Sequence, residues 1–183
     1  MRFEINFQLF KTMNRIFLIG YMGSGKTTIG KLVAKQLGYS FVDMDAHIEE
    51  KQFKTVSQIF AEKGEPEFRL LEQKCLHEVA DFENVVISTG GGAPCFFDNI
   101  EYMNAHGLSI YLKLTANELA ERLELVGINK RPLLAGKSST ELRQFIAEAL
   151  SKREPFYSKA TYALSGDINL VVNEISELVK KCH

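Results

Sequence analysis

The chain has 183 residues, of which 45% are apolar, a size and composition typical of one globular domain. Its 22 basic residues nearly balance its 23 acidic ones, and the net charge of −1 argues against a nucleic-acid surface as the main function. The three cysteines are far apart without metal-ligand spacing, and no apolar run reaches the roughly 18 residues that span a membrane, so we expect a reduced, cytoplasmic protein.

The first 13 residues end at a second methionine, Met13. They contain Glu4 and lack a small-residue cleavage site, which makes a signal peptide a poor interpretation. An edge strand, a ragged tail and a start-site artefact remain as alternatives. We expect residues 1–13 to be an extension without catalytic importance, followed by a single domain over residues 14–183.

The first predicted elements are a buried strand over residues 15–19 and a helix over residues 26–37, which Gly38 caps. Between them Gly20-Tyr21-Met22-Gly23-Ser24-Gly25-Lys26-Thr27 has the form G-x-x-x-x-G-K-[ST] of a phosphate-binding loop. In this context backbone N–H groups and the helix N-terminus face one anion. Lys26 supplies charge for the outer phosphates, and the Thr27 hydroxyl can ligate Mg²⁺. A chance glycine turn is the alternative, which the flanking elements disfavour.

Two aspartates follow the second predicted strand, over residues 41–43. Asp43 and Asp45 are two residues apart, so in extended chain their side chains share one face, and helical sequence resumes at about residue 46. Beside phosphates and Mg²⁺, one carboxylate can order metal-bound water and the other can hold a substrate hydroxyl. The alternative for Asp45 is a helix N-cap with a spare charge.

Helices and strands alternate through the rest of the chain. Capping boxes occur at residues 55–58, 115–118 and 138–141. Further strands are predicted at about residues 85–88, 109–114 and 161–164. Further helices are predicted at about residues 55–64, 66–80, 98–106, 115–125, 138–157 and 169–181, with Asp98 as the cap of the third. Residues 126–137 show neither the helical nor the strand periodicity of apolar residues, and we expect an exposed mobile loop there.

This alternation predicts an α/β sandwich, in which helices cover both faces of a parallel sheet, because the strands are short and apolar throughout. Ligands of such sheets bind at the carboxyl ends of the strands. The phosphate-binding loop, Asp45 and the glycines at residues 90–92 all follow a predicted strand. We therefore expect one active site there.

Thr89-Gly90-Gly91-Gly92 contains no aspartate, so it does not supply a standard Walker B ligand. Three glycines expose backbone amides to a group that comes very close, whereas a plain turn rarely needs three. Arginine forks suit carboxylates and phosphates, although each arginine taken singly is more often a solvated surface residue. The candidates are Arg69, Arg122, Arg131 and Arg153. The four histidines are scattered, and we interpret none as a ligand or base.

Over about residues 14–164 the chain resembles shikimate kinase. The resemblance rests on motifs in order at residues 20–30 (GYMGSGKTTIG), 41–45 (FVDMD), 59–60 (IF), 64–69 (GEPEFR), 88–92 (STGGG), 131–134 (RPLL) and 152–157 (KREPFY). It implies a three-layer kinase fold with a five-stranded parallel sheet in the order 2-3-1-4-5 and a mobile lid at about residues 126–137. It also implies transfer of the γ-phosphate of ATP to the 3-hydroxyl of shikimate in aromatic amino-acid biosynthesis, with Mg²⁺ as cofactor.

The resemblance also implies roles for individual residues. ATP would be bound by Gly23, Ser24, Gly25, Lys26, Thr27, Thr28, Arg122 and Arg131. Shikimate would be bound by Asp45, Arg69, Gly91, Gly92 and Arg153. Mg²⁺ would be held by Thr27 and, through water, by Asp43, and the catalytic residues would be Lys26, Asp45 and Arg131. The expected partners are ATP and shikimate, without nucleic acid or membrane, and the expected state is a monomer.

The chain departs from the family after the last strand. The family usually has an Asp-Thr pair and then a proline near the adenine, where residues 164–170 read LSGDINL. The resemblance therefore does not extend to the adenine contacts. A kinase for gluconate or a nucleoside monophosphate, and a regulatory nucleotide-binding module without transfer activity, are the alternatives.

Overall fold

The computed structural model of the chain describes residues 14–126, 134 and 136–182. The expected extension, residues 1–13, lies outside the described residues. So does most of the expected lid, including Arg131.

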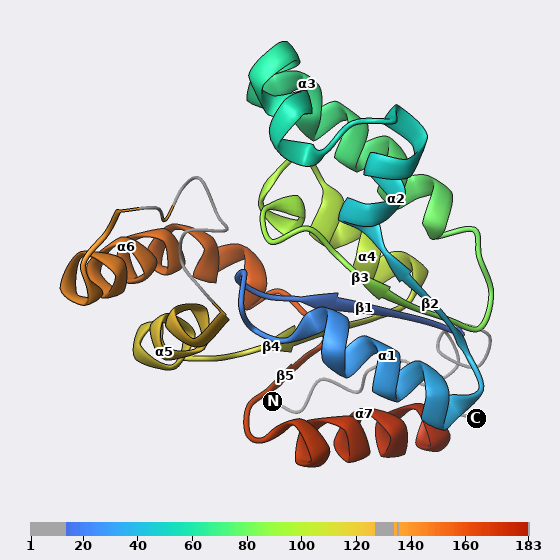
Figure 1. Cartoon of the computed structure of the whole chain (residues 1–183). Helices are drawn as coiled ribbons and strands as arrows, with labels where there is room; N and C mark the ends of the chain where they lie inside the picture. Colours follow the sequence, from blue (N-terminus) through green and yellow to red (C-terminus); the bar gives the residue numbers. More distant parts are fainter. Residues whose placement is uncertain (1–13, 127–133, 135, 183) are drawn as a thin grey trace.

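A five-stranded parallel sheet in the order β2-β3-β1-β4-β5 forms the centre of the protein (Figure 1). Its strands are β1 (Arg15–Ile19), β2 (Ser40–Asp43), β3 (Val85–Ser88), β4 (Leu108–Leu112) and β5 (Tyr162–Leu164). The order and the parallel pairing confirm the fold predicted from the sequence. The middle strands are almost wholly buried, since both faces of the sheet are covered.

Helices form the two outer layers (Figure 1). They are α1 (Lys26–Leu37), α2 (Met44–Gln52), α3 (Val56–Val79), α4 (Asn99–His106), α5 (Ala116–Val126), α6 (Ser139–Tyr157) and α7 (Ile168–Cys182), with a short 3₁₀ helix, η2 (Ala93–Cys95). Helices α1 and α7 lie side by side under the sheet, and α2, α3 and α4 lie over its other face. Within the described residues, no helix has both the length and the apolar character needed to cross a membrane.

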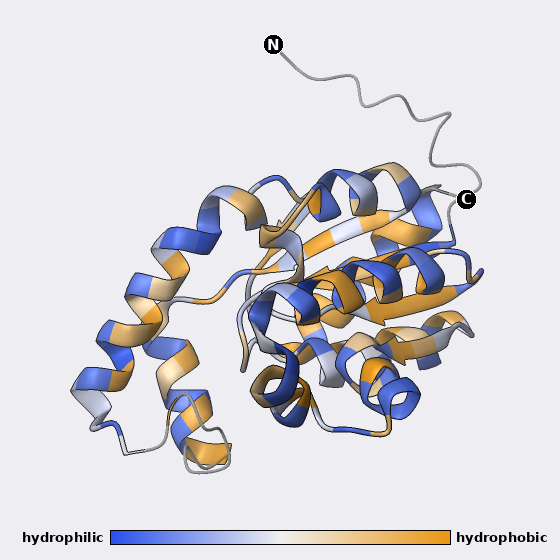
Figure 2. Cartoon of the chain, turned by 90° about the horizontal axis from the view of Figure 1, so that it is seen from above, coloured by the Kyte–Doolittle hydropathy of each residue, from blue (hydrophilic) through white to orange (hydrophobic). Residues whose placement is uncertain are grey.

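Alternate side chains of β1 separate the two main cores. Phe17 and Ile19 pack with α2, α3 and α4, whereas Ile16 and Leu18 pack with α1 and α7. A third cluster joins α5 and α6 to Tyr21 of the phosphate-binding loop. The apolar residues accordingly gather on the sheet and on the helix faces turned toward it (Figure 2). The carboxyl end of β1 and the loop that follows it are therefore held by three packed clusters.

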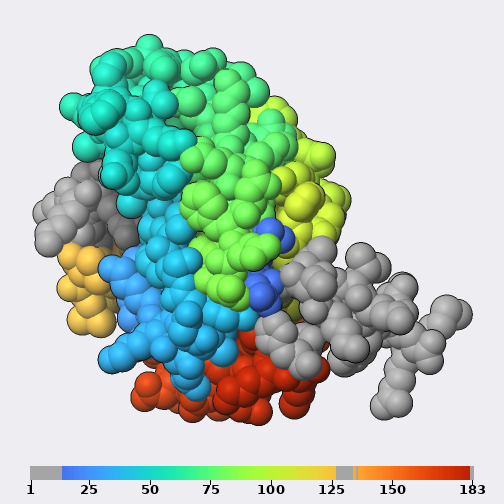
Figure 3. Space-filling view, turned by 90° about the vertical axis from the view of Figure 1, so that its right-hand side faces the viewer, coloured from blue at the N-terminus to red at the C-terminus, as the bar shows by residue number. Residues whose placement is uncertain are grey.

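The capping signals position most of the helices as predicted. Both hydrogen bonds of the capping box are present at Thr55, Thr115 and Ser138. Gly64 interrupts α3 with non-helical backbone angles (φ 77°, ψ 172°), which confirms the predicted helix end there. Figure 3 shows the side on which α2 and the two halves of α3, coloured cyan to green, form one continuous surface.

The prediction for Asp43 and Asp45 was wrong, and the prediction for Asp98 was confirmed in its position but not in its hydrogen bond. Helix α2 begins at Met44 because the Asp43 side chain caps it, accepting from the backbone N–H groups of Asp45 and Ala46. Asp45 therefore lies in the first helical turn, and the two carboxylates do not share a face of extended chain. Asp98 occupies the N-cap position of α4 without a capping hydrogen bond, since its carboxylate accepts from Gln73 instead.

Candidate active site

The phosphate-binding loop joins β1 to α1 in a conformation that requires glycine. Gly23 (φ 83°) and Gly25 (φ 94°) are left-handed, and Gly25 is the N-cap of α1. The backbone N–H groups of Gly23, Gly25 and Thr27 make no hydrogen bond to the described part of the chain. Unpaired donors at a helix N-terminus are suited to an anion.

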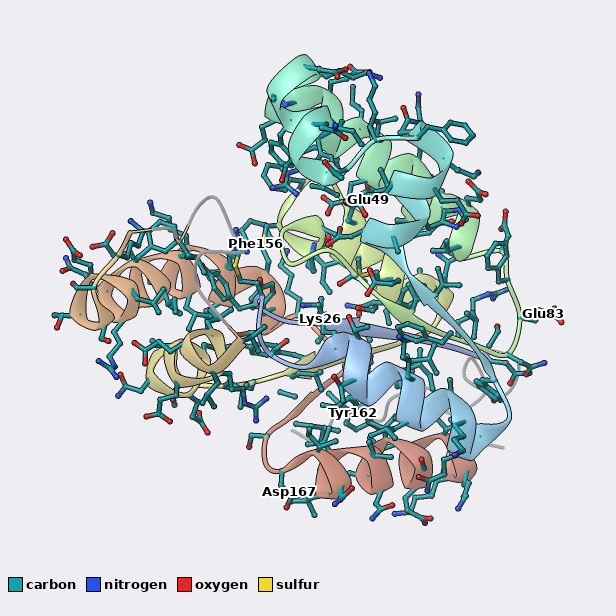
Figure 4. All side chains as sticks on the ribbon, viewed as in Figure 1. Lys26, Glu49, Glu83, Phe156, Tyr162 and Asp167 are labelled. Carbon is teal, nitrogen blue, oxygen red and sulfur yellow. The ribbon has the colours of Figure 1, made fainter. Side chains whose placement is uncertain are left out.

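Lys26 is the first residue of α1, near the middle of the molecule (Figure 4). Its ammonium donates to the carbonyl oxygens of Gly20 at 2.8 Å and Tyr21 at 3.2 Å, so the lysine folds back over the loop. An arriving phosphate offers this cation a stronger, charged acceptor than either carbonyl.

Thr27 and Asp43 meet beside the loop. The Thr27 hydroxyl donates to Asp43 Oδ2 at 2.8 Å, so two hard oxygen atoms lie together at the carboxyl ends of β1 and β2. Among the described residues, no group of three or more acidic, histidine or cysteine side chains is arranged to hold a metal ion. Mg²⁺ typically takes one or two protein oxygens and completes its shell with water and phosphate, so this pair fits Mg²⁺.

A cavity of about 550 Å³ opens in front of the loop, a size suited to a small ligand. It brings together many of the residues predicted from the sequence: Gly23, Gly25, Lys26, Thr27, Thr28, Asp43, Asp45, Gly91 and Arg122. One end is apolar, lined by Leu123, Leu125, Val126 and Ile168. None of the histidines that the structure describes lines this cavity.

Each glycine at residues 90–92 faces a charged side chain. A Cβ atom on Gly90 would lie 2.2 Å from Glu72 Oε1, and one on Gly92 would lie 2.6 Å from Arg69 Nη1. A Cβ atom on Gly91 would lie 3.5 Å from Arg153 Nη1. No side chain fits at Gly90 or Gly92 without displacing these groups. We call residues 90–92 the glycine strip.

The glycine strip presents donors to the same region. The N–H groups of Gly91 and Gly92 have no hydrogen-bond partner among the described residues, although Gly92 is buried. Buried backbone donors are nearly always paired in native proteins. An acceptor supplied by a ligand is the simplest account of both groups.

Arg69 lies against the glycine strip, already engaged by two carboxylates. Its Nη1 donates to the buried Glu72 at 2.8 Å, and its Nη2 donates to Glu65 at 2.9 Å. The guanidinium also stacks on Phe96, 4.1 Å from the ring centroid. Burial raises the pKa of Glu72, and the charge of Arg69 opposes that rise. Arg69 is thus preorganised to bind carboxylates.

Arg153 reaches the glycine strip from α6. Its Nη1 donates to the Gly91 carbonyl oxygen at 3.2 Å, and its guanidinium lies 5.1 Å from the ring centroid of Tyr21. Arg122 lies on α5, where its Nη1 donates to the Ser24 carbonyl oxygen at 3.3 Å. Arg153 therefore contacts both the glycine strip and the phosphate-binding loop. Arg122 contacts the same loop from α5, next to the apolar residues that line the cavity.

Asp45 is exposed to solvent through the open cavity, yet the surrounding protein still desolvates its carboxylate. This desolvation and the nearby charge of Asp43 raise the pKa of Asp45, while Lys26 and Arg69 act in the opposite direction. A carboxylate with a raised pKa next to a phosphate-binding loop is a candidate for accepting a hydrogen bond or proton from a reacting hydroxyl.

Sequence reasoning missed five side chains at this site. They are Tyr21, Glu65, Glu72, Phe96 and Tyr157. Spacing offered a signal for three of them. Glu65 and Glu72 lie four residues before and three after Arg69, and Tyr157 lies four after Arg153, so each shares a helix face with its arginine.

A family model, sequence relatives and solved structures each match this chain to shikimate kinases. A family model described as shikimate kinase matches residues 22–182. A shikimate kinase of Parabacteroides distasonis is 56% identical over 166 residues, covering 91% of this chain and 95% of that protein. The crystal structure of shikimate kinase from Bacteroides thetaiotaomicron superposes with a TM-score of 0.86 at 50% identity, covering 91% and 98% of the two chains. The structure of a shikimate kinase from Acinetobacter baumannii in complex with shikimate superposes with a TM-score of 0.83 at 31% identity, covering 96% of this chain and 97% of that chain.

Proposed function

The chain belongs to the shikimate kinase family, and from this premise we propose that it transfers the γ-phosphate of ATP to the 3-hydroxyl of shikimate, giving shikimate 3-phosphate and ADP. This reaction belongs to aromatic amino-acid biosynthesis. One contact supports the proposal most directly. A Cβ atom on Gly91 would lie 3.5 Å from both Gly20 O and Met22 N, so the glycine strip adjoins the phosphate-binding loop. Phosphoryl transfer depends mainly on such positioning of donor and acceptor.

The loop and α1 would hold the nucleotide. The unpaired N–H groups at Gly23, Gly25 and Thr27 suit the phosphates, with Ser24 and Thr28 beside them. Lys26 would leave the loop carbonyls and offset charge on the transferring group. Thr27 and, through water, Asp43 would hold Mg²⁺, which when bound neutralises phosphate charge.

The acceptor would lie between α2, α3, α6 and the glycine strip. Asp45, an acceptor when ionised, suits the hydroxyls of shikimate and would orient the attacking 3-hydroxyl. Arg69 and Arg153 donate only, and two forks can satisfy both oxygens of a carboxylate. The N–H groups of Gly91 and Gly92 add donors where no side chain intervenes.

Residues 126–137 are proposed as a lid, and Arg131 would close over the nucleotide to add positive charge. We further propose a monomeric enzyme acting in the cytoplasm. The free thiols of Cys75 and Cys95 suit a reducing compartment.

A coupled ADP-release assay over a panel of acceptors tests the proposed function. Shikimate is expected to support turnover, whereas gluconate and the nucleoside monophosphates are not. Gluconate carries its carboxylate on an open chain instead of a rigid ring, and the nucleoside monophosphates have no carboxylate for Arg69 and Arg153 to bind. Turnover confined to gluconate or a nucleoside monophosphate would assign another kinase. No ADP release with any acceptor would favour a regulatory nucleotide-binding module.

The contact between Glu65 and Arg69 leads to a first prediction. A substrate carboxylate at Nε and Nη2 of Arg69 must displace Glu65, whose side chain is 55% exposed. Glu65→Gln should therefore lower the shikimate KM by about two- to fivefold, the range expected for removing an exposed ion pair. Steady-state kinetics at saturating ATP measure it.

Glu62→Gln is the matched control, because Glu62 lies on the same helix but pairs with Lys54. Its shikimate KM should equal that of the wild type. A higher KM in Glu65→Gln would mean that Glu65 orients Arg69 for the substrate instead of competing with it.

A further inference from the structure

Tyr157 is a fully buried residue of α6 that contacts the glycine strip. Its hydroxyl donates to the Gly91 carbonyl oxygen at 2.5 Å, the same oxygen that accepts from Arg153. Tyr157 lies one helical turn after Arg153, so both donors come from one face of α6. A single backbone oxygen of the strip therefore receives two donors from the same direction.

These two hydrogen bonds fix the direction of the next N–H group. In a planar trans peptide the carbonyl of Gly91 and the N–H of Gly92 point in opposite directions. Because the Gly91 oxygen faces α6, the Gly92 N–H faces away from α6. The strip also approaches α2 and α3, since Cβ atoms on Gly90 and Gly92 would meet Asp45, Glu72 and Arg69.

The Gly92 N–H is also a donor that lacks a partner among the described residues, in a buried position. Such groups are rare unless a ligand or water pairs with them. Hydrogen bonds to the carbonyl polarise the shared peptide and make its N–H a stronger donor.

We propose that Tyr157 is a positioning residue, which holds the Gly91–Gly92 peptide so that the Gly92 N–H donates to the carboxylate-bearing acceptor. This role rests on the proposed function. Tyr157 also leaves Arg153 available to the substrate. When the guanidinium turns to the substrate carboxylate, the Gly91 oxygen still accepts from the Tyr157 hydroxyl.

The surroundings of Tyr157 suit this role. Burial raises the pKa of its hydroxyl, which stays protonated and able to donate at neutral pH. Its ring packs against that of Tyr111, with 5.0 Å between centroids. The Tyr111 hydroxyl donates to Glu154 at 2.8 Å, so it is a second buried tyrosine in the same cluster with its partner outside the glycine strip.

This pair of tyrosines gives a matched experiment. Tyr157→Phe is expected to raise the shikimate KM about five- to tenfold, the effect of losing one buried hydrogen bond, with the ATP KM unchanged within twofold. Tyr111→Phe also loses the hydrogen bond of a buried tyrosine, in this case to a carboxylate, and should leave both KM values unchanged. The melting temperature of Tyr111→Phe should fall at least as much as that of Tyr157→Phe, which separates positioning from folding.

The outcomes distinguish this role from the proposed function. Absence of shikimate turnover in the wild type would overturn the proposed function and this role together. An active wild type with equal shikimate KM in Tyr157→Phe would overturn the role alone, as would equal rises in the two KM values. As a measurement that needs no variant, shikimate should shift the Gly92 amide proton resonance of the wild type downfield, and an unchanged resonance would contradict the proposal.

Discussion

Lys26→Met should lower turnover by about 100-fold or more while keeping the melting temperature within a few degrees. The ammonium of Lys26 donates to the loop carbonyl oxygens of Gly20 and Tyr21, and its side chain lies outside the two main cores. During transfer it would neutralise charge that develops on the phosphoryl group. Steady-state kinetics with ATP and shikimate, together with thermal unfolding, measure both quantities.

Lys31→Met is the matched control for this substitution. Lys31 lies on the same helix, α1, with its ammonium 5.8 Å from the ring centroid of Phe41 and away from the cavity. Its turnover should equal that of the wild type. Near-normal turnover in Lys26→Met would remove the assignment of the phosphate-binding loop.

Arg153→Ala should raise the shikimate KM at least tenfold and leave the ATP KM little changed. Removing the Arg153 guanidinium leaves one oxygen of the desolvated substrate carboxylate without a donor, which costs roughly 2–5 kcal/mol. Arg143→Ala, on the same helix but outside the glycine strip, is the control and should keep both KM values. A normal shikimate KM in Arg153→Ala would exclude Arg153 from the acceptor site.

The methyl ester of shikimate tests the same contact from the ligand side. The ester should be a poor acceptor for the wild type, and its relative disadvantage should shrink in Arg153→Ala. Equal use of ester and acid by the wild type would show that Arg153 does not bind the carboxylate, even in an active kinase.

Arg69→Ala should also raise the shikimate KM at least tenfold, but it is a less selective test. It leaves the carboxylate of Glu72, which is 1% exposed, without its partner. An unpaired buried charge is strongly destabilising, so we expect this variant to lose thermal stability as well. In the part of the chain that the structure describes, Arg153 donates to a backbone carbonyl and pairs with no buried carboxylate, so Arg153→Ala should not leave such a charge.

The elements and the loop were predictable from the sequence because their signals are local. Thr55 and Gln58 form a capping box within four residues, and the phosphate-binding loop is a continuous motif between its strand and helix. The start of α2 was missed because the capping alternative was assigned to Asp45, whereas the Asp43 side chain caps this helix. Local spacing alone could not decide between them.

The contacts of the glycine strip were beyond sequence reasoning. The donor and acceptor of the Tyr157 hydrogen bond are 66 residues apart, and Gly90 meets Glu72 only because β3 and α3 pack together. The sequence predicted that something approaches the three glycines closely. Which side chains approach them depends on how α3 and α6 pack around the sheet.

The close approach at the glycine strip limits how the acceptor specificity of this protein can be redesigned. Even a methyl group at Gly90 or Gly92 would overlap the charged end of Glu72 or Arg69, so a substitution at either position must move that side chain. A library that randomises only residues 90 and 92 should yield fewer folded, active clones than one that also varies residues 69 and 72. A library aimed at new acceptors would have to vary the glycine strip together with residues 69 and 72. Substitutions in the strip should likewise have arisen together with substitutions at those two positions during evolution.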